Sequence, residues 1–472
     1  MTDDILYASI SELAELLRSR KVSSEDLTRA YLQRLEKLGP RYNAVAALTA
    51  ETARRKAKEA DDLFKRERVR TPLQGIPYGA KDLLATKDIP TTWGAEPYRK
   101  QVFDFDATVI RKLDRAGAVL AAKLAMIQLA GGGGYRYPSA SLFGPCKNPW
   151  NLERWAGGSS SGSGAAVAAA LVPFAIGSET WGSILTPASF CGVTGLRPTY
   201  GLVSRHGAMA LSWTMDKIGP MCRSAEDCGM VLQVIAGKDS QDPGSSGKSF
   251  YYLKDYGRPL LELRLGYAPA DFEERAAEPA RPALRAALEA FRKLGPKVVE
   301  ISLPPMPYGQ VAGTIIQAEG STTFEPLITS DKFNQMPDER QKAGLRAGLE
   351  MPAKDYLNAM RIRRLIQAKM REVFLQVDLI LAPSTSGPAS SINEALDRER
   401  DRRTSSDADL GAAGNLCGLP AISLPCGFST SNLPVAIQLV TRPFDELALI
   451  TIGREFQKQT DWHRRRPPAG PG

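Results

Sequence analysis

The chain has 472 residues, 43% of them hydrophobic and 24% charged, and its net charge is +9. This composition is ordinary for a folded protein with a large core, and it argues against a disordered chain. The charge does not indicate a nucleic-acid partner, because the basic residues are scattered and many alternate with acidic ones. The segment 397–403 is an example, and we expect it to be a solvated loop or helix face.

The N-terminal third begins with predicted helices. Ser9 is expected to cap a helix that starts at Ile10, with Glu12 as the second residue of a capping box. Ser23 or Ser24 is expected to cap a second helix that ends near residues 39–40, and a charged third helix is expected over 50–66.

Strands and helices alternate in the rest of the chain, which predicts an α/β fold. We expect a buried strand at 118–121, a small-residue helix at 165–171 and a polar linker at 238–248. Further strands are expected at 263–267, 297–301 and 377–382, and further helices at 282–294, 311–324 and 351–375.

The cysteines include no C-x-x-C pair, so no disulfide framework is indicated. Cys222 and Cys228 could bridge, but we expect buried thiols. The chain begins with acidic residues where a signal peptide would be basic, and its longest apolar stretch, 165–176, is too short to span a bilayer. We therefore expect a cytoplasmic protein without a membrane partner, and a homodimer remains open.

Two serine-rich turns and one upstream lysine indicate acyl-transfer chemistry. The turns cover 156–164 and 177–184, and Lys81 ends the sequence Gly-Ile-Pro-Tyr-Gly-Ala-Lys. Small residues let a backbone turn sharply and present its N–H groups to a ligand. A serine in such a turn can attack a carbonyl carbon while the N–H groups hold the oxyanion.

A histidine-based serine hydrolase is not favoured. Ser160 fits the Gly-x-Ser-x-Gly pattern, but no buried strand precedes it, and the two histidines, His206 and His463, lie in a predicted loop and a basic tail. Two isolated histidines also give no recognisable metal site, and the glycine-rich turns lack the lysine of a phosphate-binding loop.

Several segments together resemble the amidase signature family of Ser–Ser–Lys amide hydrolases. Each is weak alone, but their order and spacing are specific. The resemblance covers most of the chain and rests on residues 75–82, 144–150, 157–163, 182–184, 187–188, 191–199, 216–220, 415–425 and 433–439.

The resemblance implies a mixed β-sheet covered by helices on both faces, and a Ser–Ser–Lys triad. Ser183 is the implied nucleophile, Ser159 the bridging serine after a cis peptide bond, and Lys81 the general base. The N–H groups of Thr180, Trp181, Gly182 and Ser183 would form the oxyanion hole. Lys81 must be uncharged to accept a proton, and moving its pKa from about 10.4 to about 7 corresponds to roughly 5 kcal/mol, which burial can supply.

The predicted site also departs from the family pattern. Glu179 and Leu185 stand where relatives usually carry aspartate and arginine, so a supporting ion pair is rearranged or lost. Trp181 replaces a glycine, which disfavours a positive φ there and puts a bulky ring near the substrate.

The loop that faces the nucleophile is implied to bind substrate. Its candidate residues are Met126, Gln128, Leu129, Gly131 and Tyr135, although Met126 and Leu129 suit a core equally well. The segment 315–324 is a candidate for the far wall of an acyl pocket.

We therefore expect one amidase domain over 1–472. It divides into an N-terminal helical region (1–70), a signature core (71–235), a linker (236–260), a C-terminal part of the same body (261–460) and a flexible tail (461–472). The expected activity is hydrolysis of a small-molecule carboxylic amide through an acyl-serine, without metal or organic cofactor, with carbamates or esters as further substrates. Two alternatives stay open: a glutamine-hydrolysing subunit of a tRNA-dependent amidotransferase, and a non-catalytic binding relative.

Overall fold

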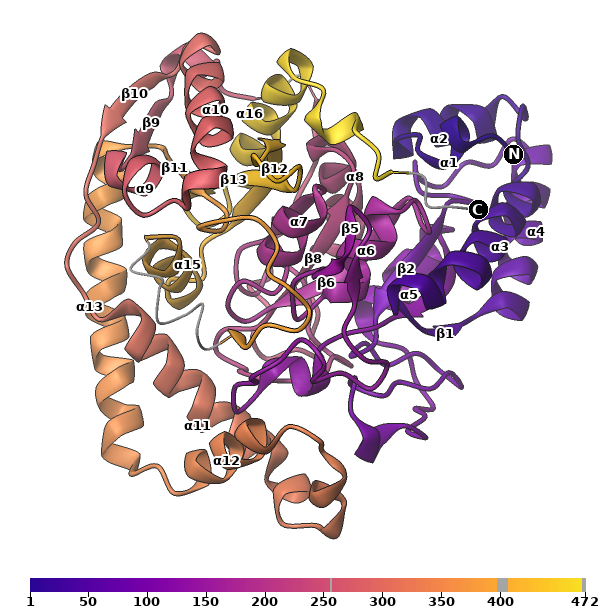
Figure 1. The fold of residues 1–472 in the computed structure, drawn as a ribbon. Helices are drawn as coiled ribbons and strands as arrows, with labels where there is room; N and C mark the ends of the chain where they lie inside the picture. Colours follow the sequence, from indigo (N-terminus) through magenta and orange to yellow (C-terminus); the bar gives the residue numbers. More distant parts are fainter. Residues whose placement is uncertain (255–256, 397–405, 469–472) are drawn as a thin grey trace.

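The computed structural model describes residues 1–254, 257–396 and 406–468, and an 11-stranded sheet runs through them (Figure 1). The strands lie in the order β1-β3-β2-β6-β8-β7-β12-β13-β11-β9-β10. Their bounds are β1 Val45–Leu48, β2 Pro77–Lys81, β3 Val119–Leu124, β6 Phe174–Glu179, β7 Thr194–Arg197, β8 Lys217–Cys222, β9 Arg264–Tyr267, β10 Lys297–Glu300, β11 Leu379–Pro383, β12 Ala421–Phe428 and β13 Pro434–Thr441. A separate ribbon pairs β4 (Lys147–Asn148) with β5 (Asn151–Trp155).

The sheet is mixed, as expected. β2 runs parallel to β3 and β6, and β9 runs parallel to β10 and β11. The other neighbouring strands pair antiparallel. The parallel groups lie towards the two ends of the strand order, and the antiparallel strands β8, β7, β12 and β13 connect them.

Helices cover both faces of the sheet, which confirms the predicted architecture (Figure 1). α8, α10 and α16 pack on one face, and α6, α7 and α15 pack on the other. The helix bounds are α1 Asp3–Leu6, α2 Ile10–Arg18, α3 Ser24–Tyr42, α4 Ala50–Lys65, α5 Thr108–Arg115, α6 Ser161–Ala168, α7 Leu185–Cys191, α8 Ala225–Ile235, α9 Pro269–Glu273, α10 Arg281–Lys293, α11 Tyr308–Ile328, α12 Glu339–Leu349, α13 Ala353–Gln376, α15 Ser406–Leu416 and α16 Glu446–Gln459.

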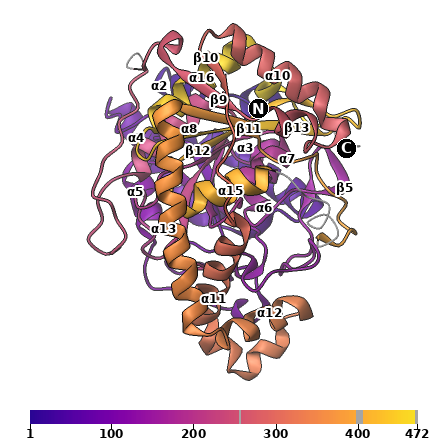
Figure 2. The same ribbon diagram turned by 90° about the vertical axis from the view of Figure 1, so that its left-hand side faces the viewer.

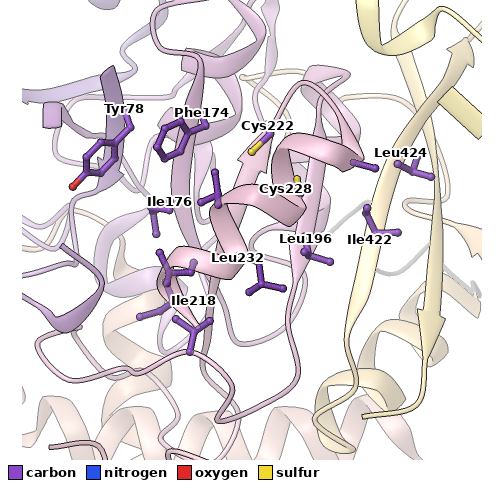
Figure 3. Close-up of a cluster of buried hydrophobic side chains, with 14 of the residues drawn as sticks. Tyr78, Phe174, Ile176, Leu196, Ile218, Cys222, Cys228, Leu232, Ile422 and Leu424 are labelled. Carbon is purple, nitrogen blue, oxygen red and sulfur yellow. The ribbon is translucent and has the colours of Figure 1, made fainter. Parts of the chain in front are cut away.

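Alternating residues of one strand enter two different cores. In β11, Leu379 and Leu381 join the core under α8, α10 and α16, whereas Ile380 and Ala382 join the core under α6, α7 and α15. Side chains of a strand point to opposite faces in turn, so a strand covered on both faces is apolar throughout. Figure 3 shows the first core, where Leu232 of α8 lies over the strands.

Several local predictions are confirmed. Ser9 and Glu12 form the capping box at the start of α2, and Ser23 caps α3 through the N–H of Asp26. Cys222 and Cys228 are buried free thiols.

The predicted helix at 165–171 is shifted. α6 begins at Ser161 and ends at Ala168, because the serine-rich turn enters the helix directly and Ala170 adopts a φ of +49°. A left-handed residue ends a helix, so the apolar run beyond it cannot remain helical.

The helices α11, α12 and α13 extend beyond one end of the sheet (Figure 2). Glu319 of α11 ties this arm to the loop before β8, since its carboxylate accepts the Ser212 hydroxyl at 2.5 Å and the Tyr356 hydroxyl of α13 at 2.8 Å.

The remaining expectations concern the linker, the tail and membrane spans. Residues 238–248 form no helix or strand, and the segment 397–403 lies outside the described residues. Within 461–472, Arg466 lies 2.8 Å from Asp4 and stacks on Tyr7. In the described ranges, every helix is too short or too polar to cross a bilayer.

Candidate active site

Lys81 is the last residue of β2, a strand held between β3 and β6 and buried along its length. Its Nζ donates to Ser159 Oγ at 2.8 Å and to Ser178 Oγ at 2.9 Å. Burial lowers the pKa of Lys81 to about 7, although the charges of Asp216 and Glu179 act in the opposite direction. A large share of this amine is therefore neutral near neutral pH and can accept a proton.

Ser159 is fixed by the turn that precedes α6. The peptide bond from Gly158 to Ser159 is cis, as the family resemblance implies. Gly157 has a φ of +84°, and a Cβ there would lie 2.7 Å from Pro187 Cα, so only glycine fits. The Ser159 carbonyl accepts the N–H of Ile127 at 3.2 Å, which holds the turn against the neighbouring loop.

Ser183 lies in the turn between β6 and α7, and it is 9% exposed. Its carbonyl accepts the N–H of Ser160 at 3.2 Å, so the two serine turns are joined through the backbone. The Ser183 hydroxyl forms no hydrogen bond within the described ranges. The structure thus brings Lys81 and Ser159 into direct contact, and it shows no direct bond between Ser159 and Ser183.

The backbone of this turn presents free donors. The N–H groups of Thr180, Trp181, Gly182 and Ser183 donate no hydrogen bond to any residue that the structure describes. Gly182 has a φ of +81°, whereas Trp181 is not among the residues with positive φ. A bulky residue is therefore accommodated at 181 without a left-handed backbone, and the four donors are available to an oxyanion.

A buried carboxylate supports the turn from behind. Glu179 Oε2 accepts the N–H groups of Ile184 at 2.9 Å and Leu185 at 3.1 Å, and Oε1 lies 2.7 Å from Arg197. Burial alone would raise the pKa of Glu179, but the charges of Arg197 and Lys217 and these hydrogen bonds lower it to about 2. The supporting ion pair is therefore rearranged and not lost: Glu179 pairs with Arg197 of β7, while position 185 is a leucine.

A second carboxylate fixes the first residue of the turn. Asp216 Oδ1 accepts the Thr180 hydroxyl at 2.5 Å, and Oδ2 accepts the N–H groups of Leu211 and Ser212 at 2.8 and 2.9 Å. Next to it, Lys217 donates to Asn415 Oδ1 at 2.6 Å.

Five of these supporting residues have no role in the site that the sequence predicts. Four of them lie in segments that carry the family resemblance, which is the signal that could have found them: Arg197, Asp216, Lys217 and Asn415. Ser178 precedes Glu179 and was seen only as part of the altered segment.

A cavity of about 540 Å³ opens beside Ser178 and Thr180. Trp213 and Tyr200 also line it, and most of its remaining wall is apolar. The apolar residues include Leu83, Ala208, Met209, Ala210, Leu211 and Ile218.

None of the five residues expected to bind substrate lines this cavity, although their neighbour Ala130 does. Met126 and Leu129 are fully buried in the core. Gln128 donates to Gln341 at 2.5 Å, and Gly131 lies under the ring of Tyr135. Their contact with substrate stays a prediction.

Neither histidine contacts the alternative nucleophile. Ser160 Oγ donates to the Ser178 carbonyl at 3.1 Å and accepts the Ser178 N–H at 3.2 Å. His206 lines the cavity, and burial lowers the pKa of His463 to about 4. In the part of the chain that the structure describes, no group of three or more His, Cys, Asp or Glu residues could hold a metal ion.

Comparisons with known proteins show which family the chain is similar to. The amidase family model matches residues 26–450. The chain is 37% identical to a glutamyl-tRNA(Gln) amidotransferase subunit from Methylococcus capsulatus, over 97% of this chain and 98% of the relative.

Solved structures of the family share the fold. The native peptide amidase from Stenotrophomonas maltophilia matches with a TM-score of 0.84 and 30% identity, over 98% of each chain. A glutamyl-tRNA(Gln) amidotransferase subunit from Thermotoga maritima matches with a TM-score of 0.80 and 29% identity, over 99% of this chain and 98% of that one. The chain belongs to the amidase signature family.

Proposed function

We propose that this protein, an amidase-family enzyme acting on amide bonds, hydrolyses a small-molecule carboxylic amide through an acyl-Ser183 intermediate. Lys81 is the general base and Ser159 carries the proton between Lys81 and Ser183. The observation that supports this assignment most strongly is the 2.8 Å hydrogen bond from Lys81 Nζ to Ser159 Oγ inside a fully buried site.

The acylation step transfers two protons in sequence. Ser159 takes the proton of Ser183 and gives its own to the neutral Nζ of Lys81, while Ser183 Oγ attacks the carbonyl carbon. The free N–H groups of residues 180–183 stabilise the negative oxygen that forms. The C–N bond then breaks, and the leaving amine takes a proton back through Ser159.

Deacylation repeats the same transfers with water. A water molecule gives its proton through Ser159 to Lys81 and attacks the acyl-Ser183 ester. The tetrahedral species collapses, the carboxylic acid leaves, and Ser183 regains its proton. The side chains named here account for every proton, so the proposal requires no metal or organic cofactor.

The test combines three variants with covalent labelling. Ser183→Ala, Lys81→Ala and Lys81→Arg should each abolish turnover, the last because a guanidinium does not lose its proton. Ser163→Ala is a matched control, since Ser163 is a buried serine of the same segment whose hydroxyl makes a single 3.3 Å bond to the Ile176 carbonyl. It should keep most of the activity.

Intact mass after treatment with a fluorophosphonate separates an enzyme from a binding protein. One adduct that maps to Ser183 supports the proposal. A folded protein that forms no adduct and hydrolyses no amide supports the non-catalytic alternative. Substantial activity in Lys81→Arg contradicts the assignment of the base.

A second candidate is a glutamine-hydrolysing subunit that supplies ammonia to a partner. The 37% identity to a glutamyl-tRNA(Gln) amidotransferase subunit over nearly the whole of both chains favours it. Trp181, in place of the family's glycine, weighs against it, because it alters the wall beside the nucleophile. Glutaminase activity together with a stoichiometric partner on copurification would support this second candidate.

A further inference from the structure

Resting on the proposed function, we infer that the enzyme prefers amides with a short acyl group and a bulky apolar or aromatic amine. Trp181 closes the acyl side of the nucleophile turn, and the cavity beside Ser178 receives the amine. The two assignments rest on what lies around the nucleophile turn (residues 180–183): the cavity beside Ser178 on one side, and the Trp181 ring with α11 and α15 on the other.

The cavity reaches the proton-relay residues through Ser178, which lines it. The leaving amine must approach Ser159, because that hydroxyl returns the proton when the C–N bond breaks. Lys81 Nζ bonds both Ser159 and Ser178, and Ser178 lines the cavity. The nitrogen substituent of a bound amide therefore points to this space.

The walls of the cavity suit an uncharged, apolar group. A volume of about 540 Å³ is within the range that holds small organic ligands. Trp213, 42% exposed, and Tyr200 provide aromatic surface for an aryl amine. The charged groups of the wall already have partners in the protein. Arg205 lies 2.9 Å from Asp242, Asp216 accepts the Thr180 hydroxyl, and Lys217 donates to Asn415.

Trp181 occupies a different side of the turn. A Cβ added to Gly309 of α11 would lie 3.6 Å from Trp181 Cη2, and one added to Gly411 of α15 would lie 3.4 Å from its Nε1. Neither glycine lines the cavity. The indole ring thus fills a slot that α11 and α15 leave open by carrying glycine at these positions.

The arrangement of groups around the tetrahedral carbon then indicates on which side of the turn the acyl group lies. Its oxygen faces the N–H groups of 180–183, and its nitrogen faces Ser159 and the cavity. With the nitrogen substituent assigned to the cavity, the acyl carbon is assigned to the other side of the turn, which Trp181 fills. A long acyl chain would meet the indole ring, whereas an acetyl group is short enough to avoid it.

Two substrate series test this inference on the full chain. In the first, anilides carry acetyl, butyryl or octanoyl groups, and kcat/KM should fall at least about tenfold from acetyl to octanoyl. In the second, the acyl group stays acetyl and the amine changes from ammonia to aniline, and kcat/KM should rise at least about tenfold.

Variants at Trp181 and Trp213 test the acyl side and the amine cavity separately. Trp181→Ala should remove most of the dependence of kcat/KM on acyl length. Trp181→Leu should remove part of it, and this variant serves if the alanine variant does not fold. Trp213→Ala should reduce the preference for aniline over ammonia without changing the acyl-length dependence. Trp462→Ala, near the C-terminus against Phe428, should change neither ratio.

The outcomes distinguish this inference from the proposed function. If octanoyl anilide is hydrolysed as well as acetanilide, or if a folded Trp181 variant keeps the wild-type acyl dependence, the inference is overturned while the acyl-serine mechanism stands. If no amide is hydrolysed and no fluorophosphonate adduct forms on Ser183, the proposed function fails first and the inference fails with it.

Discussion

Replacing Glu179 by glutamine tests the buried ion pair behind the nucleophile turn. Glu179 and Arg197 lie 2.7 Å apart, and both side chains are 0% exposed. Burial opposes ionisation of Glu179, but the charges of Arg197 and Lys217 lower its pKa from 4.5 to about 2. The folded-state pKa is the lower one, so this carboxylate stabilises the fold above about pH 4.5, and the contribution is lost as the pH falls towards 2.

Two arguments give the expected loss in the free energy of unfolding: the lowered pKa of Glu179, and the charge of Arg197 that Glu179→Gln leaves without a partner. A lowering from 4.5 to about 2 corresponds to about 3 kcal/mol at neutral pH. Leaving one charge of a buried pair uncompensated costs about 3–5 kcal/mol. Both arguments predict that Glu179→Gln lowers the free energy of unfolding by about 3 kcal/mol or more.

The assay is urea unfolding at pH 7, with an exposed ion pair as the control. Glu59 and Arg55 of α4 lie 2.6 Å apart, and their side chains are 51% and 59% exposed. Glu59→Gln should therefore lower the free energy of unfolding by less than about 1 kcal/mol. The double variant Glu179→Gln/Arg197→Met should recover part of the loss, because it removes the stranded charge. Equal losses for Glu179→Gln and the control would refute the reasoning.

Two other variants and a thiol reagent probe the same site and core. Gly182→Ala should lower both activity and thermal stability, because its φ is +81° and the new Cβ would lie 3.0 Å from Thr186 Oγ1; unchanged values would contradict this. Asp216→Asn should lower kcat, because it weakens the hydrogen bond that anchors Thr180 in the nucleophile turn; an unchanged kcat in steady-state kinetics would contradict that role. Cys222 and Cys228 should react with a thiol reagent only after unfolding, because both are buried; rapid labelling of the native protein would count against the core.

The sequence predicts local structure well where one short segment contains the whole cause. Ser9 and Glu12 are three residues apart, so a capping box is visible without any tertiary contact. The alternation of strands and helices likewise indicates an α/β fold, because each element must bury one face. The end of α6 was missed, since nothing in an alanine-rich run shows that Ala170 adopts a positive φ.

The site was predicted only as far as the family resemblance reaches. Lys81 and Ser159 are 78 residues apart, and physical reasoning from residue types could not have joined them. The Glu179–Arg197 pair links the end of β6 to β7, strands that are separated by β8 in the sheet. Such a contact depends on strand order, which periodicity does not reveal.

The cavity could not be predicted from the sequence either, because residues far apart in the chain form its walls. Its walls come from Leu83, Ser178, Trp213 and Asp242, and no single motif contains them. The predicted substrate residues all lie in one continuous loop at 126–135, of which Ala130 lines the cavity. Which side of a turn faces a cavity is settled by tertiary packing alone.

The pH dependence of the rate at which a fluorophosphonate labels Ser183 tests the central claim most directly. Lys81 acts when neutral, and its pKa is lowered to about 7, so the labelling rate should reach half of its maximum near pH 7 and level off about two pH units higher. Lys81→Ala should remove this transition. A labelling rate that keeps rising through pH 10 in the wild type, as expected for a lysine with an ordinary pKa, would contradict the account.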